Sequence, residues 1–399
     1  MKKAENFERT AYRKVREFVE NIYLDHAATT PMHPEVITAM TDVMNETFGN
    51  PSSVHSFGRQ AAGKLEMARE VIGKSLGVKY HEIIFNSGGT EGDNTAIIGT
   101  ALARKNEGRH LITTQIEHPA VLNTMKYLET QGFEVTYLPV DDKGNLSMAD
   151  FEASLRPDTI LVSIMYGNNE IGNLMPIKEI GECLKNHPAY FHTDAVQAYG
   201  NQFIRPHELG VDLLSISAHK INGPKGVGFL FKSDEAHIDP LLRGGEQEEK
   251  RRAGTENLAG ICGLAKAVEL LTEEEREKRN QLYNQFTTNI LSALDAEAID
   301  YHVNGDLTNK LPHVLNLRFT GIINDLLLMK LDLRGIAVST GSACTAGTID
   351  PSHVLEAVYG ENSNEVKESV RVSFGYGNTI EQVDYFIEQL IMSLKELTK

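Results

Sequence analysis

Between residues 80 and 232 the chain alternates short apolar runs with helical patterns, and this alternation limits the fold more than any other feature. The apolar runs lie at residues 82–86, 110–113, 134–138, 159–165, 190–193, 213–217 and 227–231, with helical patterns at 94–105, 119–130 and 176–186. Such alternation predicts βαβ units and a mostly parallel sheet that helices cover on both faces. Ligands of such sheets lie beyond the carboxyl ends of the strands.

After residue 265 the pattern changes, which indicates a second, smaller domain of the α+β class. Helical patterns lie at residues 269–293, 325–333 and 380–397, and a strand pattern lies at 314–319. The length of 399 residues also exceeds the ~250–300 residues at which a single hydrophobic core usually stops growing.

Composition excludes several classes of function. The formal net charge of −16 gives no general attraction to nucleic acids or anionic membranes. No apolar run approaches the ~20 residues of a membrane span. The three cysteines are too widely spaced for a disulfide framework or a zinc site, so we expect no metal and a reducing, cytoplasmic location.

One segment in the middle of the chain carries the strongest chemical signal. Residues 215–226 read SISAHKINGPKG, so Lys220 directly follows a predicted strand and precedes a glycine–proline loop. A lysine at the mouth of a sheet, on a loop that lets the backbone approach a ligand, can form a Schiff base. A single lysine after a strand is usually an ordinary surface residue, so this interpretation depends on the other residues of the site.

Three further candidates also follow predicted strands. Asp194, in the run FHTDAVQ, can keep a pyridine nitrogen protonated, although such residues are often only helix N-caps. The turn SGGTEG at 87–92 offers N–H groups to a phosphate, although short glycine clusters often form plain turns. His118 can stack on a flat cofactor or move protons, although a histidine at such a position more often has only a structural role. Together with Lys220, these groups describe a pyridoxal phosphate site.

Longer motifs extend the comparison along nearly the whole chain. They are YLDHAATTP from residue 23, NNEIG from 168, RAGT from 252, GSACT from 341 and VRVSFG from 370. In this order they resemble the cysteine desulfurases (NifS/IscS-like) of the fold-type I pyridoxal phosphate-dependent transferase superfamily. The resemblance implies an α/β fold with an N-terminal extension at 1–21, a large domain at 35–264 with a mostly parallel sheet, and a smaller α+β domain from 22–34 plus 265–399.

The resemblance also implies a role for each matching residue. Lys220 resembles the Schiff-base lysine, Asp194 the partner of the pyridinium nitrogen, and His118 the stacking imidazole, which we also count as catalytic. Arg371 and Asn169 resemble the clamp on the substrate carboxylate, and an arginine fork suits a carboxylate. The remaining cofactor contacts that the resemblance implies are Gly89, Thr90, Gln197, Ser217, His219 and, from the partner subunit of a homodimer, Thr255.

Cys344 distinguishes this family from ordinary aminotransferases. It lies in STGSACTAGT at 339–348, whose small residues predict a mobile loop. The thiol must reach the substrate sulfur and then carry it to an acceptor. Free thiols have a pKa of ~8.5, so a nearby positive charge should favour the thiolate. Cys183 and Cys262 lie in a helical and a small-residue segment, and we interpret them as structural.

The implied reaction converts L-cysteine to L-alanine through a persulfide on Cys344. The sulfur then passes to a protein acceptor, either an iron–sulfur scaffold or a tRNA thiolation enzyme. A selenocysteine lyase or another pyridoxal phosphate-dependent transferase is the closest alternative, although an aminotransferase needs no thiol loop. A non-catalytic sulfur-relay scaffold would bind no cofactor. A nucleic-acid-binding module is disfavoured, because the basic cluster at 250–252 is short.

Overall fold

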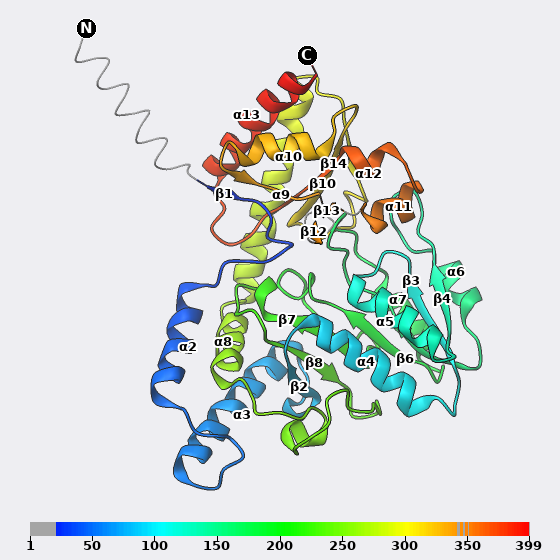
Figure 1. Ribbon diagram of the computed structural model, residues 1–399, viewed down its shortest axis with the longest axis vertical. Helices are drawn as coiled ribbons and strands as arrows, with labels where there is room; N and C mark the ends of the chain where they lie inside the picture. Colours follow the sequence, from blue (N-terminus) through cyan, green and yellow to red (C-terminus); the bar gives the residue numbers. More distant parts are fainter. Residues whose placement is uncertain (1–20, 341–343, 346–347, 350, 399) are drawn as a thin grey trace, which may run out of the picture.

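The main element of the computed structural model, which describes residues 21–340, 344–345, 348–349 and 351–398, is a seven-stranded sheet (Figure 1). The order across it is β2 (Ile83–Asn86), β8 (Gly228–Lys232), β7 (Leu213–Ser217), β6 (Tyr190–Asp194), β5 (Thr159–Ser163), β3 (His110–Thr114) and β4 (Glu134–Leu138). Strand β8 is antiparallel to both neighbours, and the remaining pairs are parallel. The expected α/β fold with a mostly parallel sheet is confirmed. The predicted extension lies outside the described residues, apart from Asn21.

Helices cover both faces of this sheet because alternate strand residues are apolar on both sides. In β8, Phe229 and Phe231 pack in the core with α3 (Ser56–Leu76), α7 (Ile177–Leu184) and α8 (Leu258–Glu269). Leu230 points to the opposite face, where it packs with Ala96 of α4 (Gly89–Arg104). On that face α4 also packs against α5 (Pro119–Thr130). Helix α2 (Pro34–Glu46) packs against α8, on the face of the sheet that α3 also covers.

Two element boundaries differ from the sequence-based expectation, and the first of them lies at the site. Helix α4 begins at Gly89 and not at residue 94, because Gly88 takes φ = 140° and the following residues turn directly into the helix. This φ is open mainly to glycine. The helix expected at 269–293 is α9 (Glu273–Ala296), which begins four residues later because its N-cap Thr272 accepts a hydrogen bond from the Glu275 N–H.

A second sheet belongs to the C-terminal part of the chain. Strands β14 (Ser369–Ser373), β10 (Val314–Phe319) and β9 (Tyr301–Asn304) form it in that order and are antiparallel. Its core packs against α9, α10 (Asn324–Asp332) and α13 (Ile380–Leu397). Strand β1 (Ile22–Tyr23) joins this part by pairing with β11 (Ile336–Ala337). The domain boundaries stay a prediction, since the larger core also includes Leu311 and Val354.

The remaining elements are short. They are α6 (Met148–Ser154), α11 (His353–Tyr359), α12 (Asn364–Glu368), the paired strands β12 (Cys344–Thr345) and β13 (Thr348–Ile349), and the 3-10 turns η1 (Tyr80–Glu82), η2 (Ala218–Lys220) and η3 (Gln247–Lys250). Across the described part of the chain, none of the helices combines the length and apolar character needed to cross a membrane.

Candidate active site

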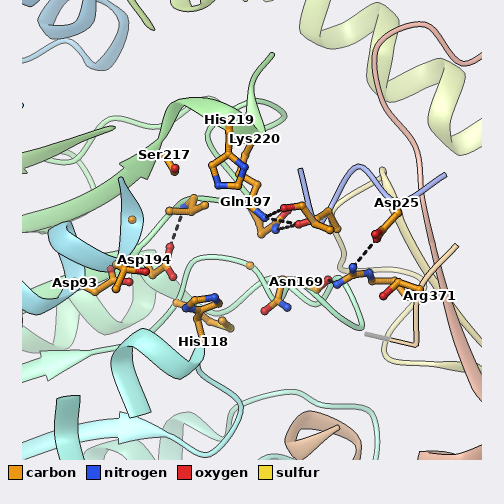
Figure 2. Close-up of a pocket in the computed structure, with 18 residues that line it drawn as sticks. Asp25, Asp93, His118, Asn169, Asp194, Gln197, Ser217, His219, Lys220 and Arg371 are labelled. Carbon is orange, nitrogen blue, oxygen red and sulfur yellow. Dashed lines mark hydrogen bonds and ion pairs between the residues drawn. The ribbon is translucent and has the colours of Figure 1, made fainter. Parts of the chain in front are cut away.

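A cavity of about 450 Å³ lies at the carboxyl ends of the parallel strands (Figure 2). It collects nearly all of the residues that the sequence singled out. Its lining is Asp25, Ala27, Ala28, Gly89, Thr90, Asp93, His118, Met165, Gly167, Asn169, Asp194, Val196, Gln197, Ser217, His219, Lys220, Ser339 and Arg371. Parallel strands end at the same edge of a sheet, which explains how residues far apart in the sequence meet here.

Lys220 ends the turn η2 directly after β7 and reaches back to the segment that follows β1. Its Nζ donates to the carbonyl oxygens of Ala27 (2.5 Å) and Ala28 (2.8 Å). Burial lowers the pKa of Lys220 to about 8, and the nearby Arg371 acts in the same direction. An amine with such a pKa is partly unprotonated near neutral pH, as a nucleophile toward an aldehyde must be.

This lowered pKa predicts how apoprotein takes up an aldehyde cofactor as pH changes. Only the neutral amine attacks the aldehyde, so we expect the uptake rate to rise with pH and to reach half its maximum near pH 8. At that pH an ordinary lysine would be only about 0.4% unprotonated. The measurement is stopped-flow absorbance of apoprotein mixed with pyridoxal phosphate across pH. If the uptake rate reached half its maximum only near the pKa of an ordinary lysine, the lowered pKa of Lys220 would be contradicted.

Buried acids lie at the opposite end of the cavity from Arg371 (Figure 2). Asp194 ends β6, and its Oδ1 accepts from the Val196 N–H (2.9 Å). Possible ligand atoms of Asp93, His118 and Asp194 lie within 4.8 Å of one another, and Asp93 Oδ1 has no hydrogen-bond partner in the described part of the chain. Burial raises the pKa of both carboxyl groups, and the Asp194 carboxylate also raises the pKa of Asp93.

Asp93 Oδ1 lies 3.6 Å from His192 Nε2, and the pair of buried acids tests whether the cavity suits pyridoxal phosphate. Two buried acids side by side call for a cationic partner, and a protonated pyridine nitrogen is such a partner. His118 lies beside them as the N-cap of α5, where Nδ1 accepts from the Ala120 N–H (3.1 Å). Burial lowers the pKa of His118, which favours the neutral ring. The donor set therefore fits this cofactor, and we interpret the acids as part of its site.

The N-terminus of α4 forms another wall of the cavity, where a phosphate would fit. A Cβ at Gly89 would lie 2.8 Å from Val196 Cγ2, so only glycine allows this close approach. Thr90 and Ser217 line the same region with hydroxyl groups, and free helix N–H groups favour an anion there. His219 Nδ1 lies 3.1 Å from Thr29 Oγ1, and burial lowers the pKa of His219 to about 4.

Arg371 of β14 enters the cavity from the second sheet. Its guanidinium donates to Asp25 Oδ1 (2.7 Å) and to the Asn169 carbonyl oxygen (3.0 Å). Its Nε is buried and has no hydrogen-bond partner in the described part of the chain. The backbone of Arg371 pairs with Ser339, just before the cysteine segment. A fixed, incompletely satisfied guanidinium is suited to bind a carboxylate.

One predicted site residue does not line this cavity, and the side chain of another lies outside what the structure describes. Thr255 is exposed and is not among the lining residues, and the sequence assigned it to a partner subunit. The backbone of Cys344 belongs to β12, but its side chain lies outside what the structure describes.

Several other lining residues were not predicted from the sequence. Asp25 lies in the quoted motif YLDHAATTP but received no role, and Ser339 opens the cysteine segment. Asp93 follows Thr90 by three residues, a spacing that places both on one face of a helix. Had the helix been expected to begin at Gly89, this spacing would have indicated Asp93.

Comparisons with known proteins agree with this geometry. The aminotransferase class-V family model matches residues 22–386. The protein named "Putative cysteine desulfurase IscS 1" of Bacillus subtilis (strain 168) is 53% identical, covering 95% of this chain and 100% of its own. Cysteine desulfurase IscS of Methanosarcina thermophila is 47% identical, covering 94% and 93%. A solved NifS-like protein superposes with a TM-score of 0.88 at 36% identity, covering 94% and 100%.

The fold, the cavity and the matched proteins together identify the class as the pyridoxal phosphate-dependent transferases. The chain belongs to the cysteine desulfurases of the aminotransferase class-V family. The recognition made from the sequence motifs is confirmed.

Proposed function

We propose that this protein binds pyridoxal phosphate in the 450 Å³ cavity and removes sulfur from L-cysteine, releasing L-alanine. The observation that carries the proposal is the meeting of Lys220, with its lowered pKa, and the buried acids Asp93 and Asp194 in one cavity. A solved relative described as SspA in complex with cysteine is 35% identical, with a TM-score of 0.77 and coverage of 88% of this chain, and supports cysteine as the substrate.

The cofactor would be held at five places. Lys220 would bond its aldehyde carbon, Asp194 would keep its ring nitrogen protonated, and His118 would lie against its ring. Gly89, Thr90, Ser217 and His219 would bind its phosphate, and Gln197 would donate to its ring oxygen. When bound, pyridoxal phosphate supplies an electron sink for the Cα of the substrate.

The protein's own residues perform the remaining tasks. Arg371 and Asn169 bind and orient the substrate carboxylate. Lys220 Nζ, once released, removes the Cα proton and can return it, because its pKa of about 8 lies near neutral pH. The Cys344 thiolate forms a bond to the substrate sulfur as the carbon–sulfur bond breaks. The balance is L-cysteine plus thiol giving L-alanine plus persulfide, with no external oxidant.

The function is tested by incubating the protein, loaded with pyridoxal phosphate, with L-cysteine and measuring the amounts of alanine and protein-bound sulfur. We expect alanine to form together with an equal amount of protein-bound sulfur, and turnover when a thiol removes that sulfur. Loaded protein that binds cysteine but releases no alanine would refute the proposal. The same assay with L-selenocysteine measures the preference between the two substrates.

Arg371 offers a specific test of substrate binding. We expect Arg371→Lys to raise KM for L-cysteine about 10- to 100-fold, because a lysine cannot reproduce two parallel hydrogen bonds to a carboxylate. The measurement is steady-state alanine formation. Arg318→Lys is the matched control, since Arg318 lies on the adjacent strand β10 and pairs with Glu365 and Glu368 away from the cavity. An unchanged KM in Arg371→Lys would refute the assigned clamp.

We also propose a homodimer in which the partner subunit supplies Thr255 to the phosphate. The proposal is supported by exposed apolar side chains on α2, α3 and the segment between them, an unusual cluster for a free surface. They are Ile37, Met44, Phe48, Val54, Phe57 and Met67. The sulfur acceptor would be an iron–sulfur scaffold or a tRNA thiolation enzyme, and the cysteine pattern supports a cytoplasmic location.

A further inference from the structure

A buried chain of polar side chains leads from the cavity into the C-terminal part of the fold. Gln197 lines the cavity, and its Nε2 donates to the Ala27 carbonyl oxygen (2.9 Å). Its Oε1 lies 3.3 Å from His313 Nε2. His313 Nδ1 in turn lies 3.0 Å from Asn201 Nδ2. His313 is 6% exposed, directly precedes β10 and does not line the cavity itself.

The carbonyl group of Ala27 fixes the direction of every hydrogen bond in this chain. A carbonyl oxygen only accepts, so the amide nitrogen of Gln197 must face it and Oε1 must face His313. His313 Nε2 must then carry the proton. In a neutral ring Nδ1 is therefore an acceptor, and Asn201 must present its amide nitrogen. The tautomer of His313 follows from these contacts alone.

The surroundings keep His313 neutral. Burial lowers the pKa of His313 to about 3, and nearby Lys310, His26, Arg371 and Lys220 all act in the same direction. A neutral ring with a fixed tautomer holds Gln197 in one orientation. If the amide turned over, Oε1 would meet the Ala27 carbonyl oxygen and the amide N–H would meet the N–H of His313. Two favourable contacts would become two repulsive ones.

We propose that His313 is a positioning residue, which holds the Gln197 amide so that its second N–H is a donor to the ring oxygen of the bound cofactor. That N–H has no other acceptor within the described ranges. The inference rests on the proposed function, because the acceptor belongs to pyridoxal phosphate. His313 acts only through Gln197.

The expected consequence is spectroscopic. Lys220 Nζ and Gln197 Nε2 share the Ala27 carbonyl oxygen as acceptor, so the amide lies close to the lysine nitrogen that binds the cofactor. A donor on the ring oxygen stabilises its negative charge and makes the proton on the neighbouring lysine-derived nitrogen easier to lose. Without that donor, the pKa seen in the visible absorbance of the loaded protein should rise by about half to one unit.

The test is a pH titration of the visible absorbance of loaded protein, with the affinity for pyridoxal phosphate as a second readout. We expect His313→Leu to raise this pKa as Gln197→Leu does, and the double variant to show no further shift. His313→Gln, which keeps a donor near the position of Nε2, should retain the wild-type value.

His110→Leu is the matched control for loss of a buried histidine. His110 is 1% exposed and contacts the hydroxyl groups of Thr159 and Thr136, away from the cavity. We expect it to lower the thermal unfolding temperature but to leave the titration unchanged.

Three results would overturn the inference. In the first, folded His313→Leu keeps the wild-type pKa of the visible absorbance. In the second, His110→Leu shifts this pKa as much as His313→Leu does. In the third, His313→Gln shifts it as much as Gln197→Leu does. The last comparison remains decisive if His313→Leu does not fold. Failure of the proposed function would look different, because wild-type protein would then bind no pyridoxal phosphate or form no alanine from L-cysteine.

Discussion

We expect Cys344→Ala to bind pyridoxal phosphate normally and to form almost no alanine from L-cysteine, with a loss of more than about a hundredfold. The thiolate at this position is the only group in the proposed reaction that can accept the substrate sulfur. The cavity that binds the cofactor is formed by other residues, so cofactor absorbance should survive. The measurement pairs alanine release with cyanolysis of protein-bound sulfur.

The other two cysteines provide matched controls for this result. Cys183 lies in α7 and Cys262 in α8, neither lines the cavity, and burial raises the pKa of both thiols. Thiols with raised pKa are poor nucleophiles near neutral pH. Cys183→Ala and Cys262→Ala should therefore keep near wild-type turnover. Substantial alanine formation by Cys344→Ala, with no thiol added, would contradict the assignment.

The second large effect concerns Lys220. We expect Lys220→Ala to lose the covalent link to pyridoxal phosphate and to lower alanine formation by at least about 10²- to 10⁴-fold, because the same amine also moves the Cα proton. The measurement is borohydride reduction followed by peptide mapping. In wild-type protein the reduced cofactor should be found on the peptide that contains Lys220.

Lys225 is the matched control, since it lies in the same glycine–proline loop but is exposed and does not line the cavity. Lys225→Ala should keep both the covalent link and the activity. A reduced cofactor attached to another lysine in wild-type protein would contradict the choice of Lys220.

Much of the fold could be predicted because its signals are local. Buried strands such as 159–163 are nearly continuous apolar runs, and the carboxyl ends of parallel strands meet at one edge. The meeting of Lys220, Asp194 and Thr90 follows from that geometry. By contrast, the boundary of α4 depends on the backbone of Gly88, whose φ cannot be read from a glycine-rich pattern alone.

The unpredicted parts of the site depend on contacts between distant segments. Asp25 reaches Arg371 only because β1 pairs with β11 and brings the following residues to the cavity. His313 reaches Gln197 across the boundary between the two sheets. Neither pairing has a sequence spacing that would reveal it, since the partners lie more than a hundred residues apart.

In the proposed reaction, one cavity receives L-cysteine and passes its sulfur to Cys344. The most direct test is a single turnover of loaded protein with sulfur-labelled L-cysteine, followed by digestion and mass spectrometry of every cysteine peptide. We expect one additional sulfur on the Cys344 peptide and an equal amount of alanine. Label on the peptide of Cys183 or Cys262 instead, or alanine with no sulfur on Cys344, would contradict it.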